Sequence, residues 1–497
     1  MTVVDQIELE SYLLGAANIL RNIIDAGDYK QYIFPLLFYK RICDVYDEEF
    51  KKTLEESGGD IEYAEFSENH RFQIPKESHW NVLRTITKDL GKKIQDSMRE
   101  IEKSNPDTLF GIFGDAQWTN KKRFSDNILK DLIEHFSSID LSLEHIPQDQ
   151  LGEGYEYLIK NFADDSGHNA QEFYTNRTIV SLMAELLDPQ PGESIYDPTC
   201  GSGGMLLVAA LHVKNKANEY RNLKLYGQEI NTISSSIARM NLYLHGIEDF
   251  KVIRGNTLDN PAFTKSDHLE KFDVILANPP YSIKSWNREA WVNDKWGRNV
   301  YGTPPQGRAD YAFFQHIIKS MNNQSGRCSI LFPLGVLFRE DEKLMRIKLI
   351  KDDKIECVIG LAPNLFYNSP MEACVVICKS KKPENRKNKI LLINAIDLAK
   401  REKGQSFLEP VHLKKIKEAY KEFKNILEFS KVLNTSEALE NNGSLSIPLY
   451  IKSNNTREEF NDSILQDLIE EWNENSIKLR DQYKYFLSML EGIDLNE

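Results

Sequence analysis

Short apolar runs alternate with helix-like segments between residues 194 and 394, and this alternation restricts the folds that the chain can adopt. The runs have the length and bounding residues of buried strands, at 194–196, 224–229, 250–254, 272–277, 327–332, 355–359, 373–378 and 390–394. Segments with helical spacing of apolar residues follow some of these runs, at 204–213, 232–244 and 311–321. Strands joined through helices form a mostly parallel sheet with helices on both faces, so we predict an α/β fold.

The rest of the chain has mainly the three-to-four spacing of amphipathic helices. These helices are predicted at 7–14, 16–20, 32–42, 80–101, 128–136, 178–187, 411–429 and 458–490. A chain of 497 residues is too long for one hydrophobic core. We therefore predict an N-terminal helical domain at 1–150, the α/β domain at 151–400, and a C-terminal helical region at 401–497. The apolar stripe of the last helix needs a partner, which is either the N-terminal domain or another chain.

Composition and charge narrow the classes of protein. Hydrophobic residues make up 41% of the chain and charged residues 28%, which is typical of a globular protein. No apolar run is long enough to span a bilayer, and the N-terminus lacks the pattern of a signal peptide, so we predict a cytoplasmic protein without membrane contact. The net charge is −13, whereas proteins that bind DNA unaided usually carry a basic face. Any chemistry on DNA is therefore expected to need a partner protein.

The cysteines do not predict a metal site. Only two of the six lie close together in the sequence, and no second pair or histidine cluster completes a zinc-binding set. We interpret them as buried free thiols, and Cys200 as a small packing residue within a glycine-rich loop.

That loop, residues 197–204, joins a predicted strand to a predicted helix and reads Asp-Pro-Thr-Cys-Gly-Ser-Gly-Gly. Its spacing is neither the dinucleotide fingerprint nor a phosphate-binding loop. Asp197 at the strand end would repel a phosphate but can accept hydrogen bonds from an ammonium group. Glu229 ends the next strand, where doubly wound folds bind ribose hydroxyls. A cationic amino acid joined to a nucleoside describes S-adenosylmethionine. The alternatives are the glycine turn of any Rossmann-like domain and a plain surface carboxylate.

The sequence Asn278-Pro279-Pro280-Tyr281 follows the apolar run 272–277, at the carboxyl end of a predicted strand. Two prolines fix φ and remove two backbone donors, and the residue before a proline is held extended. The resulting corner presents an amide oxygen, bare carbonyls and an aromatic ring. The alternative interpretation is a rigid turn with a packing tyrosine.

This corner suits a flat amine on an aromatic ring. The nitrogen lone pair of an amine such as adenine N6 is conjugated into the ring, which makes it a poor nucleophile. The Asn278 amide oxygen and the Pro279 carbonyl are the candidate acceptors that would favour a pyramidal nitrogen. Tyr281 would stack on the ring.

The segments 172–175 and 197–204, then Glu229, then 278–281 follow one another along the chain. This order of motifs resembles that of the N6-adenine DNA methyltransferases, and more narrowly that of the modification subunit of type I restriction–modification systems. The resemblance covers essentially the whole chain and includes residues 310–314 and 360–367. It implies a Rossmann-like methyltransferase domain flanked by helices. It also implies a cofactor pocket for S-adenosylmethionine formed by Glu172, Phe173, Tyr174, Thr175, Asn176, Arg177, Asp197, Thr199, Gly201, Ser202, Gly203, Gly204 and Glu229. The chain departs from the family's usual proline at Asn176 and from its usual aspartate at Asn256.

The resemblance also implies partners. In this family a separate specificity subunit reads the DNA sequence, two modification subunits hold one specificity subunit, and a third kind of subunit translocates and cleaves DNA. Double-stranded DNA would present a flipped adenine, because N6 cannot be reached inside the duplex. We expect the helical ends to be docking surfaces, and deletion of residues after about 455 to abolish co-purification with a specificity subunit.

A segment after the corner, residues 282–309, combines basic and aromatic side chains. It contains three of the chain's six tryptophans and the basic residues Lys284, Arg288, Lys295, Arg298 and Arg308. Such a mixture suits contact with a DNA backbone and stacking on unpaired bases. The alternative is a surface loop whose tryptophans pack on the domain.

We therefore predict direct methyl transfer to adenine N6 within a type I restriction–modification complex, without a metal. Catalysis would consist chiefly of positioning. Two alternatives remain from the sequence. The first is a stand-alone methyltransferase acting on another planar nitrogen, in protein glutamine or an RNA base. The second is a non-catalytic scaffold subunit.

Overall fold

A computed structural model describes residues 4–21, 23–164, 175–217, 222–363, 365, 371–402, 405–452 and 479–480. The chain divides into two compact units, Met1–Ile447 and Pro448–Glu497. In the second unit, only residues 448–452 and 479–480 are described. The predicted helix at 458–490 therefore lies almost wholly outside the described residues.

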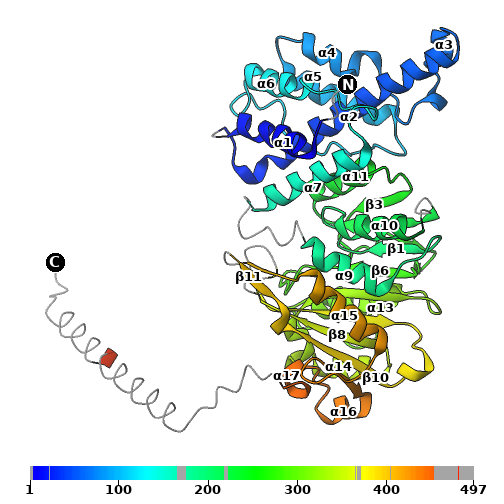
Figure 1. Cartoon of the computed structure of the whole chain (residues 1–497), viewed down its shortest axis with the longest axis vertical. Coiled ribbons are helices and arrows are strands. Elements are labelled where there is room, and N and C mark those ends of the chain that lie inside the picture. The colour runs from blue at the N-terminus through cyan, green and yellow to red at the C-terminus, as the bar shows by residue number, and fades with distance from the viewer. Residues whose placement is uncertain are drawn as a thin grey trace. The chain divides into compact units, whose positions relative to one another are not determined.

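The N-terminal part is a bundle of amphipathic helices around one apolar core (Figure 1). Its helices are α1 Gln6–Leu20, α2 Lys30–Glu56, α3 Ile61–Ala64, α4 Trp80–Thr85, α5 Leu90–Ser104, α6 Asp126–Ser137 and α7 Gln148–Asp164. In α1 the buried residues Leu9, Leu13, Ala16 and Leu20 recur at helical spacing, and Asp5 caps the first turn. The predicted N-terminal helical domain is confirmed.

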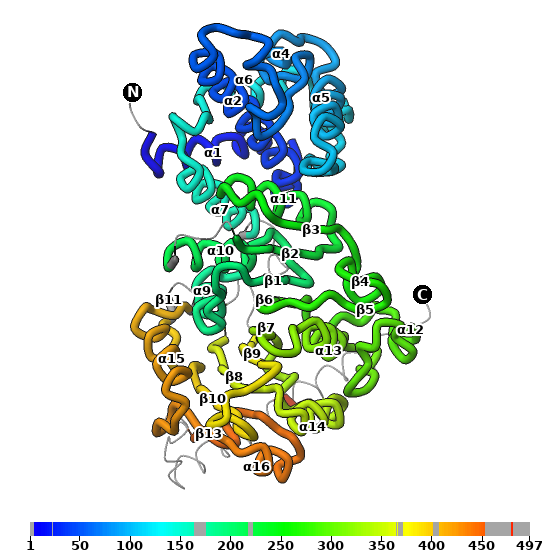
Figure 2. The backbone as a smooth tube through the Cα atoms, turned by 90° about the vertical axis from the view of Figure 1, so that its right-hand side faces the viewer, coloured from blue at the N-terminus to red at the C-terminus, as the bar shows by residue number. Residues whose placement is uncertain are grey.

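Helix α11, Thr232–Leu244, belongs to the sheet domain but completes the core of the N-terminal bundle. Its buried residues Ile237, Met240 and Leu244 pack with the N-terminal helices, whereas Ala238 and Leu242 pack over the sheet. Figures 1 and 2 both show α7 and α11 between the N-terminal helices and the strands. One helix thus serves two cores because apolar residues cover two of its faces.

The α/β part is built on one nine-stranded sheet, in the order β13-β10-β8-β9-β7-β6-β1-β2-β3. Figure 2 shows β3 nearest the N-terminal helices and β13 farthest from them. The strands are β1 Ser194–Asp197, β2 Lys224–Glu229, β3 Phe250–Arg254, β6 Val274–Ala277, β7 Arg327–Pro333, β8 Ile355–Leu361, β9 Ala373–Lys379, β10 Lys389–Ala395 and β13 Ser430–Asn434. Strand β9 runs antiparallel to both neighbours and β13 antiparallel to β10, whereas the other pairs are parallel. The predicted α/β fold is confirmed.

Helices cover both faces of this sheet. On one face the core contains residues of α9 Arg177–Leu187, α10 Gly204–Ala217, α11 and α15 Pro410–Glu422. Figure 2 shows α13 Asp310–Ser320 and α14 Lys343–Lys351 on the opposite side from α9, α10 and α15. The remaining short elements are α12 Arg288–Val292, α16 Thr435–Glu440, α17 Ile447–Tyr450, and the hairpins β4 Thr264–Lys265 with β5 His268–Leu269 and β11 Lys400–Glu402 with β12 Gln405–Phe407.

The predicted helix at 411–429 is wrong in its second half. Helix α15 ends at Glu422, and Phe423 adopts a left-handed conformation that stops it. The chain then returns as β13, which pairs with β10 and extends the sheet past residue 400. Residues 423–429 form the turn between α15 and β13, closed by hydrogen bonds between Ile426 and Ser430. The three predicted domain boundaries stay a prediction.

None of the described helices has the length and apolar character required to cross a lipid bilayer. Within the same residues, no group of three or more His, Cys, Asp or Glu side chains is arranged to hold a metal ion.

Candidate active site

The predicted site residues after β1, β2 and β6 lie at one edge of the sheet, because these strands are parallel neighbours. In the pairing register Tyr196 lies opposite Ile275, and Asp197 opposite Gly227. Adjacent strands are about 4.8 Å apart, so the chain leaves β1, β2 and β6 side by side. The loop after β1 carries the glycines, Glu229 ends β2, and Asn278 follows β6.

Glu229 closes the glycine turn through backbone contacts. Its two carboxylate oxygens accept hydrogen bonds from the amides of Gly201, at 2.9 Å, and Asn231, at 2.8 Å. The turn also needs glycine at position 203, where φ is +79° and an added Cβ would lie 3.2 Å from the backbone of Ala238. A carboxylate offers about four acceptor sites, so Glu229 can still accept from ribose hydroxyls.

Asp197 is buried at the end of β1, with 2% of its surface exposed. Burial raises the pKa of its carboxyl group to about 8, and the charge of Glu229 adds to this effect. The amide of Thr199 donates to it at 3.0 Å and acts in the opposite direction. A cationic ligand would stabilise the charged form of this buried carboxyl group.

Arg177 connects the glycine turn to the N-terminal helices. Its guanidinium forms a two-point ion pair with Glu156 of α7, one contact of which measures 2.9 Å. It also fills the space beside Gly204, where an added Cβ would clash with it. Asn241 of α11 donates to both Glu156, at 2.7 Å, and the Ser202 carbonyl, at 3.1 Å. These contacts brace the turn from behind.

Sequence reasoning did not identify Glu156 or Asn241 in this bracing. Each lies far along the chain from the glycine turn, and nothing in the local sequence of α7 or α11 marks it. Their hydrogen bonds arise only when the two helices pack together.

Three more predicted residues, Glu172, Phe173 and Tyr174, lie outside the described residues. Of their neighbours, Asn176 caps α9: its side-chain oxygen accepts from the Thr178 amide at 2.9 Å. This local role explains how an asparagine serves at a position where the family has proline.

Asn278 points toward the start of α9. Its Nδ2 donates to the Thr175 hydroxyl at 3.0 Å, which orients the side-chain amide. The other amide atom, Oδ1, is buried and accepts no hydrogen bond from the described residues. The amide is therefore held close to the start of α9, and its oxygen has no partner among the described residues. Pro279 is buried and Pro280 half-buried.

Tyr281 is half-buried and packs against the core on the α9 face of the sheet. Its hydroxyl is buried and makes no hydrogen bond within the described chain. Burial raises the pKa of this hydroxyl well above its ordinary value, so it stays protonated and can act as a donor.

Three orphaned polar atoms lie on the loops at this edge. Within the described residues, the Thr199 hydroxyl, Asn278 Oδ1 and the Tyr281 hydroxyl are all buried without a hydrogen-bond partner. Burying a polar group without a partner costs about 1–3 kcal/mol, and a ligand bound here would satisfy these atoms. Together with Asp197 and Glu229, this donor and acceptor set fits a cationic nucleoside.

The segment 282–309 is packed more tightly than DNA contact would require. Arg298 is 1% exposed; it pairs with Asp294 and donates to the carbonyls of Thr257, at 2.9 Å, and Leu258, at 2.7 Å. Its guanidinium also lies 4.5 Å from the Trp291 ring centroid. The prediction that Arg298 contacts DNA is therefore wrong, since its charge is used inside the domain. Exposed Lys284 and Lys295 are the basic side chains that remain available.

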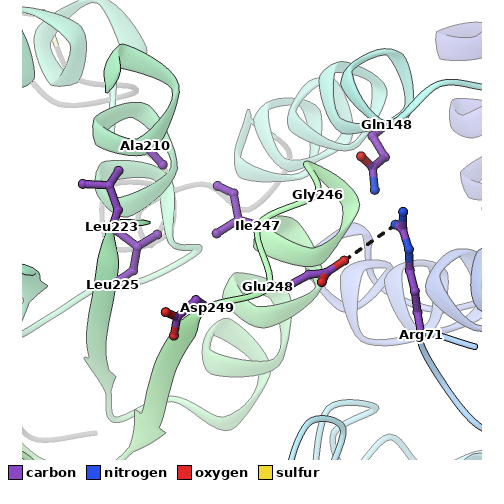
Figure 3. Close-up of a pocket in the computed structure, with 9 residues that line it drawn as sticks. All are labelled: Arg71, Gln148, Ala210, Leu223, Leu225, Gly246, Ile247, Glu248 and Asp249. Carbon is purple, nitrogen blue, oxygen red and sulfur yellow. Dashed lines mark ion pairs between the residues drawn. The ribbon is translucent and has the colours of Figure 1, made fainter. Parts of the chain in front are cut away.

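A cavity of about 420 Å³ lies at the opposite edge of the sheet, away from these residues (Figure 3). It is lined by Arg71, Gln148, Ala210, Leu223, Leu225, Gly246, Ile247, Glu248 and Asp249. Leu223 and Asp249 directly precede β2 and β3, so the cavity opens at the amino ends of these strands. Two of its charged side chains, Arg71 and Glu248, form an ion pair at 3.8 Å, and its lining contains none of the predicted site residues.

Comparison with protein families gives two matches that together span most of the chain. Residues 147–459 match the N-6 DNA methylase family, and residues 9–136 match the HsdM N-terminal domain.

Two curated proteins are similar over nearly the full length of the chain. The type I restriction enzyme MjaVIII methylase subunit of Methanocaldococcus jannaschii is 31% identical, with 98% of this chain and 84% of that protein aligned. The MpnII methylase subunit of Mycoplasma pneumoniae is 27% identical, with 98% of each chain aligned.

The fold is also similar to a solved structure. The crystal structure of a type I restriction–modification system methyltransferase subunit from Streptococcus thermophilus superimposes with a TM-score of 0.78 at 29% identity. The superposition covers 90% of this chain and all of that one.

Proposed function

This chain belongs to the N6 DNA methylase family as a type I restriction–modification methylase subunit, and from this premise we propose how its residues perform adenine methylation. The chain is an adenine-specific DNA methyltransferase, and its family uses S-adenosylmethionine.

The cofactor pocket is proposed at the carboxyl ends of β1 and β2. Asp197 accepts from the cofactor's ammonium group and Glu229 from its ribose hydroxyls. The glycine turn, with Thr199, Gly201, Ser202, Gly203 and Gly204, lets the ligand approach the backbone, and the proposed pocket also includes residues 172–177. The bound cofactor supplies a methyl group on a sulfonium, an electrophile that needs no metal. The raised pKa of Asp197 and the orphaned Thr199 hydroxyl support this assignment.

The base pocket is proposed at the corner 278–281. Asn278 Oδ1 and the Pro279 carbonyl accept the two hydrogens of the adenine amine, which frees the nitrogen lone pair for attack. Pro280 stiffens the corner, and Tyr281 stacks on the flipped ring. The chain's contribution is orientation, because the amine and the methyl group must meet in line. The observation that carries this proposal is the oriented Asn278 amide, held through Nδ2 by Thr175 with Oδ1 buried and unsatisfied by the described chain.

The partners follow from membership in a type I complex. We propose that double-stranded DNA is the substrate, that a specificity subunit reads its sequence, and that a second copy of this chain and a translocase subunit join the complex. The net charge of −13 supports DNA binding in which partner subunits supply part of the contact. A cytoplasmic location is part of the same proposal.

Substitution of Asn278 tests the role of the corner. In the complex assembled with its specificity subunit, Asn278→Ala should lower methyl transfer to DNA by at least about 100-fold, since one acceptor of the amine is lost. Binding of S-adenosylmethionine should stay within about threefold of wild type. Gly201→Asp, in the cofactor turn, should lose both activities. Tritium transfer to DNA and calorimetric titration of the cofactor measure the two effects.

Asn322→Ala is a matched control, because Asn322 lies at the opposite edge of the sheet and donates to Asp273 there. It should transfer methyl groups at the wild-type rate. An active complex carrying Asn278→Ala and Tyr281→Ala together would contradict the proposal and indicate that this chain is a scaffold.

A further inference from the structure

The residue that directly follows the catalytic corner is held in an unfavourable backbone conformation. Ser282 has a φ of +53°, in the left-handed region that favours glycine. Such strain persists only where the surroundings hold it in place, and it is often found at functional sites. We propose that Asp310 and Arg339 are positioning residues that hold Ser282 in this conformation and thereby aim the corner 278–281. This inference rests on the proposed role of that corner.

Asp310 makes the contact that holds Ser282. Its Oδ1 accepts a hydrogen bond from the Ser282 amide at 2.8 Å. Asp310 is the first residue of α13 and is 1% exposed, so water cannot replace this acceptor. A hydrogen bond from a backbone amide to a buried carboxylate is stronger than one between neutral groups. The bond therefore fixes the point at which the chain leaves Tyr281.

Arg339 in turn holds Asp310. Its guanidinium donates to Asp310 Oδ2 at 2.7 Å, on the carboxylate oxygen that does not face Ser282. The two oxygens of one carboxylate thus connect two different loops. Since an isolated buried carboxylate is costly, the arginine also makes it possible to keep this charge inside the domain.

Arg339 is itself fixed by its surroundings. It follows β7 by a 3₁₀ turn, Leu334–Leu337, and its guanidinium lies over Gly335, where an added Cβ would be 2.4 Å from its Nε. The buried Arg346 of α14 donates to the Arg339 carbonyl at 3.0 Å and to the Gly443 carbonyl at 2.7 Å. The Arg346 contact therefore holds the Arg339 backbone, and Gly335 leaves room for its guanidinium.

This arrangement ties together the two loops that leave neighbouring strands. Strands β6 and β7 are parallel, with Ala277 opposite Ile330, so the corner after β6 and the turn after β7 lie at the same edge. Asp310 lies between them and contacts both. Without it, Ser282 can relax to a negative φ, and the preceding Tyr281 ring would turn away from the Asn278 amide.

The test is methyl transfer by Asp310→Ala in the complex with its specificity subunit. The rate at saturating substrates should fall at least about 100-fold, while the affinity for S-adenosylmethionine stays within about threefold. Hydrogen exchange gives a second readout that does not depend on activity. In Asp310→Ala the amide in the peptide around Ser282 should exchange faster, whereas α13 from residue 313 onward should keep its protection.

A second substitution separates positioning from general support of the fold. Glycine adopts a positive φ without strain, so Ser282→Gly added to Asp310→Ala should restore at least about tenfold of the lost rate. If Asp310 only supported α13, the added Ser282→Gly substitution would restore none of the lost rate. Absence of rescue together with unchanged exchange at Ser282 would overturn the inference.

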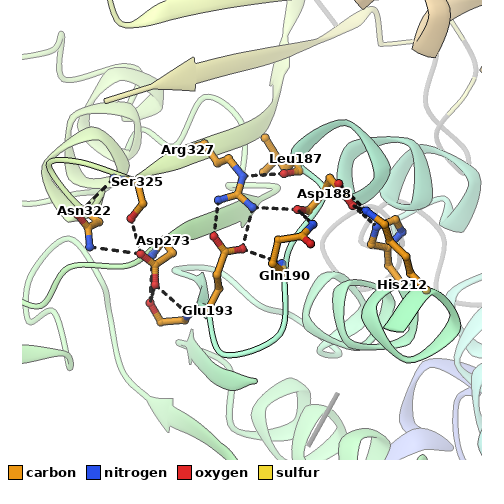
Figure 4. Close-up of polar contacts among 11 residues, drawn as sticks. Leu187, Asp188, Gln190, Glu193, His212, Asp273, Asn322, Ser325 and Arg327 are labelled. Atoms are coloured by element: carbon orange, nitrogen blue, oxygen red, sulfur yellow. Dashed lines mark hydrogen bonds and ion pairs between the residues drawn. The ribbon is translucent and has the colours of Figure 1, made fainter. Parts of the chain in front are cut away.

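A matched control exists at the opposite edge of the sheet (Figure 4). There Glu193, just before β1, forms a two-point ion pair with Arg327 of β7, with both contacts at 2.8 Å. Glu193→Ala removes a partly buried acid–arginine pair that also joins two strands. Its thermal stability should fall as in Asp310→Ala, while its methyl transfer rate should remain at the wild-type value.

The outcomes distinguish this inference from the proposed function. Wild-type activity in Asp310→Ala, with Asn278→Ala inactive, would overturn the positioning role alone. Full activity in Asn278→Ala would instead overturn the role of the corner on which the inference depends.

Discussion

At the scale of single residues, the buried carboxyl group of Asp197 should make ligand binding in the candidate cofactor pocket depend on pH. Its pKa lies at about 8, above the ordinary value for aspartate, mainly because of burial. Below pH 8 the group in the free protein is therefore mostly neutral, and a neutral carboxyl group binds a cation poorly. Binding of a cationic ligand must expel the proton.

We therefore expect the affinity for S-adenosylmethionine to rise with pH, by up to about tenfold per pH unit between pH 6 and 7.5, and to pass through a maximum near pH 8, where the ligand's own ammonium group loses its proton. Binding at pH 6.5 should release close to one proton. Calorimetric titrations in two buffers with different ionisation enthalpies measure this release. Asp197→Asn should bind more weakly but without the pH dependence, and a wild-type affinity that is flat across this range would contradict the assignment.

At the scale of elements, the turn between β1 and α10 depends on a positive φ, which glycine adopts without strain and other residues rarely adopt. The turn approaches α11 so closely that Gly203 leaves no room for a Cβ atom without displacing Ala238. The apolar residues of α10 and the hydrogen bond from the Gly201 amide to Glu229 then hold the turn against the sheet.

Replacement of Gly203 by alanine should destabilise the protein by about 2 kcal/mol, of which about 1 kcal/mol comes from the positive φ alone. Gly192 is the control, because its φ is +84° but an added Cβ would meet nothing within 4 Å. Gly192→Ala should therefore lose only the smaller amount. Urea unfolding of both variants measures the difference, and equal losses would show that the contact with Ala238 is unimportant.

At the scale of the whole first unit, the helical bundle and the sheet share α11, so neither has a complete core alone. Polar contacts reinforce this interface: Arg239 of α11 donates to the carbonyls of Thr108 and Phe110, both at 2.6 Å. The two parts are therefore expected to unfold together.

Met240→Lys should test this coupling, since Met240 is completely buried where α11 meets the helical bundle. Placing a charge there should cost at least about 3 kcal/mol and lower the unfolding temperature of the helical and sheet parts alike. Phe110→Lys is the control, because Phe110 lies at the same interface but is 74% exposed, and it should unfold like the wild type. Two separate transitions, with only one of them shifted by Met240→Lys, would contradict the shared core.

Several features of this protein are determined by local sequence and could be predicted from it. The strands at 224–229 and 250–254 and the helix at 232–244 were predicted with the bounds that the structure has. Their apolar periodicity and capping residues act over a few neighbouring residues. A restricted backbone at 278–281 could also be predicted, because proline restricts its own backbone and that of the residue before it.

Other features were decided only by the tertiary structure, because they depend on residues brought together from distant parts of the chain. The antiparallel strand β13, the burial of Arg298 and the bracing of the glycine turn by Glu156 and Asn241 are of this kind. The bond from Ser282 to Asp310 spans 28 residues, and neither residue's neighbours reveal it. Local periodicity therefore specified which elements form, whereas packing between distant elements decided which charges are buried and which polar atoms remain free to bind a ligand.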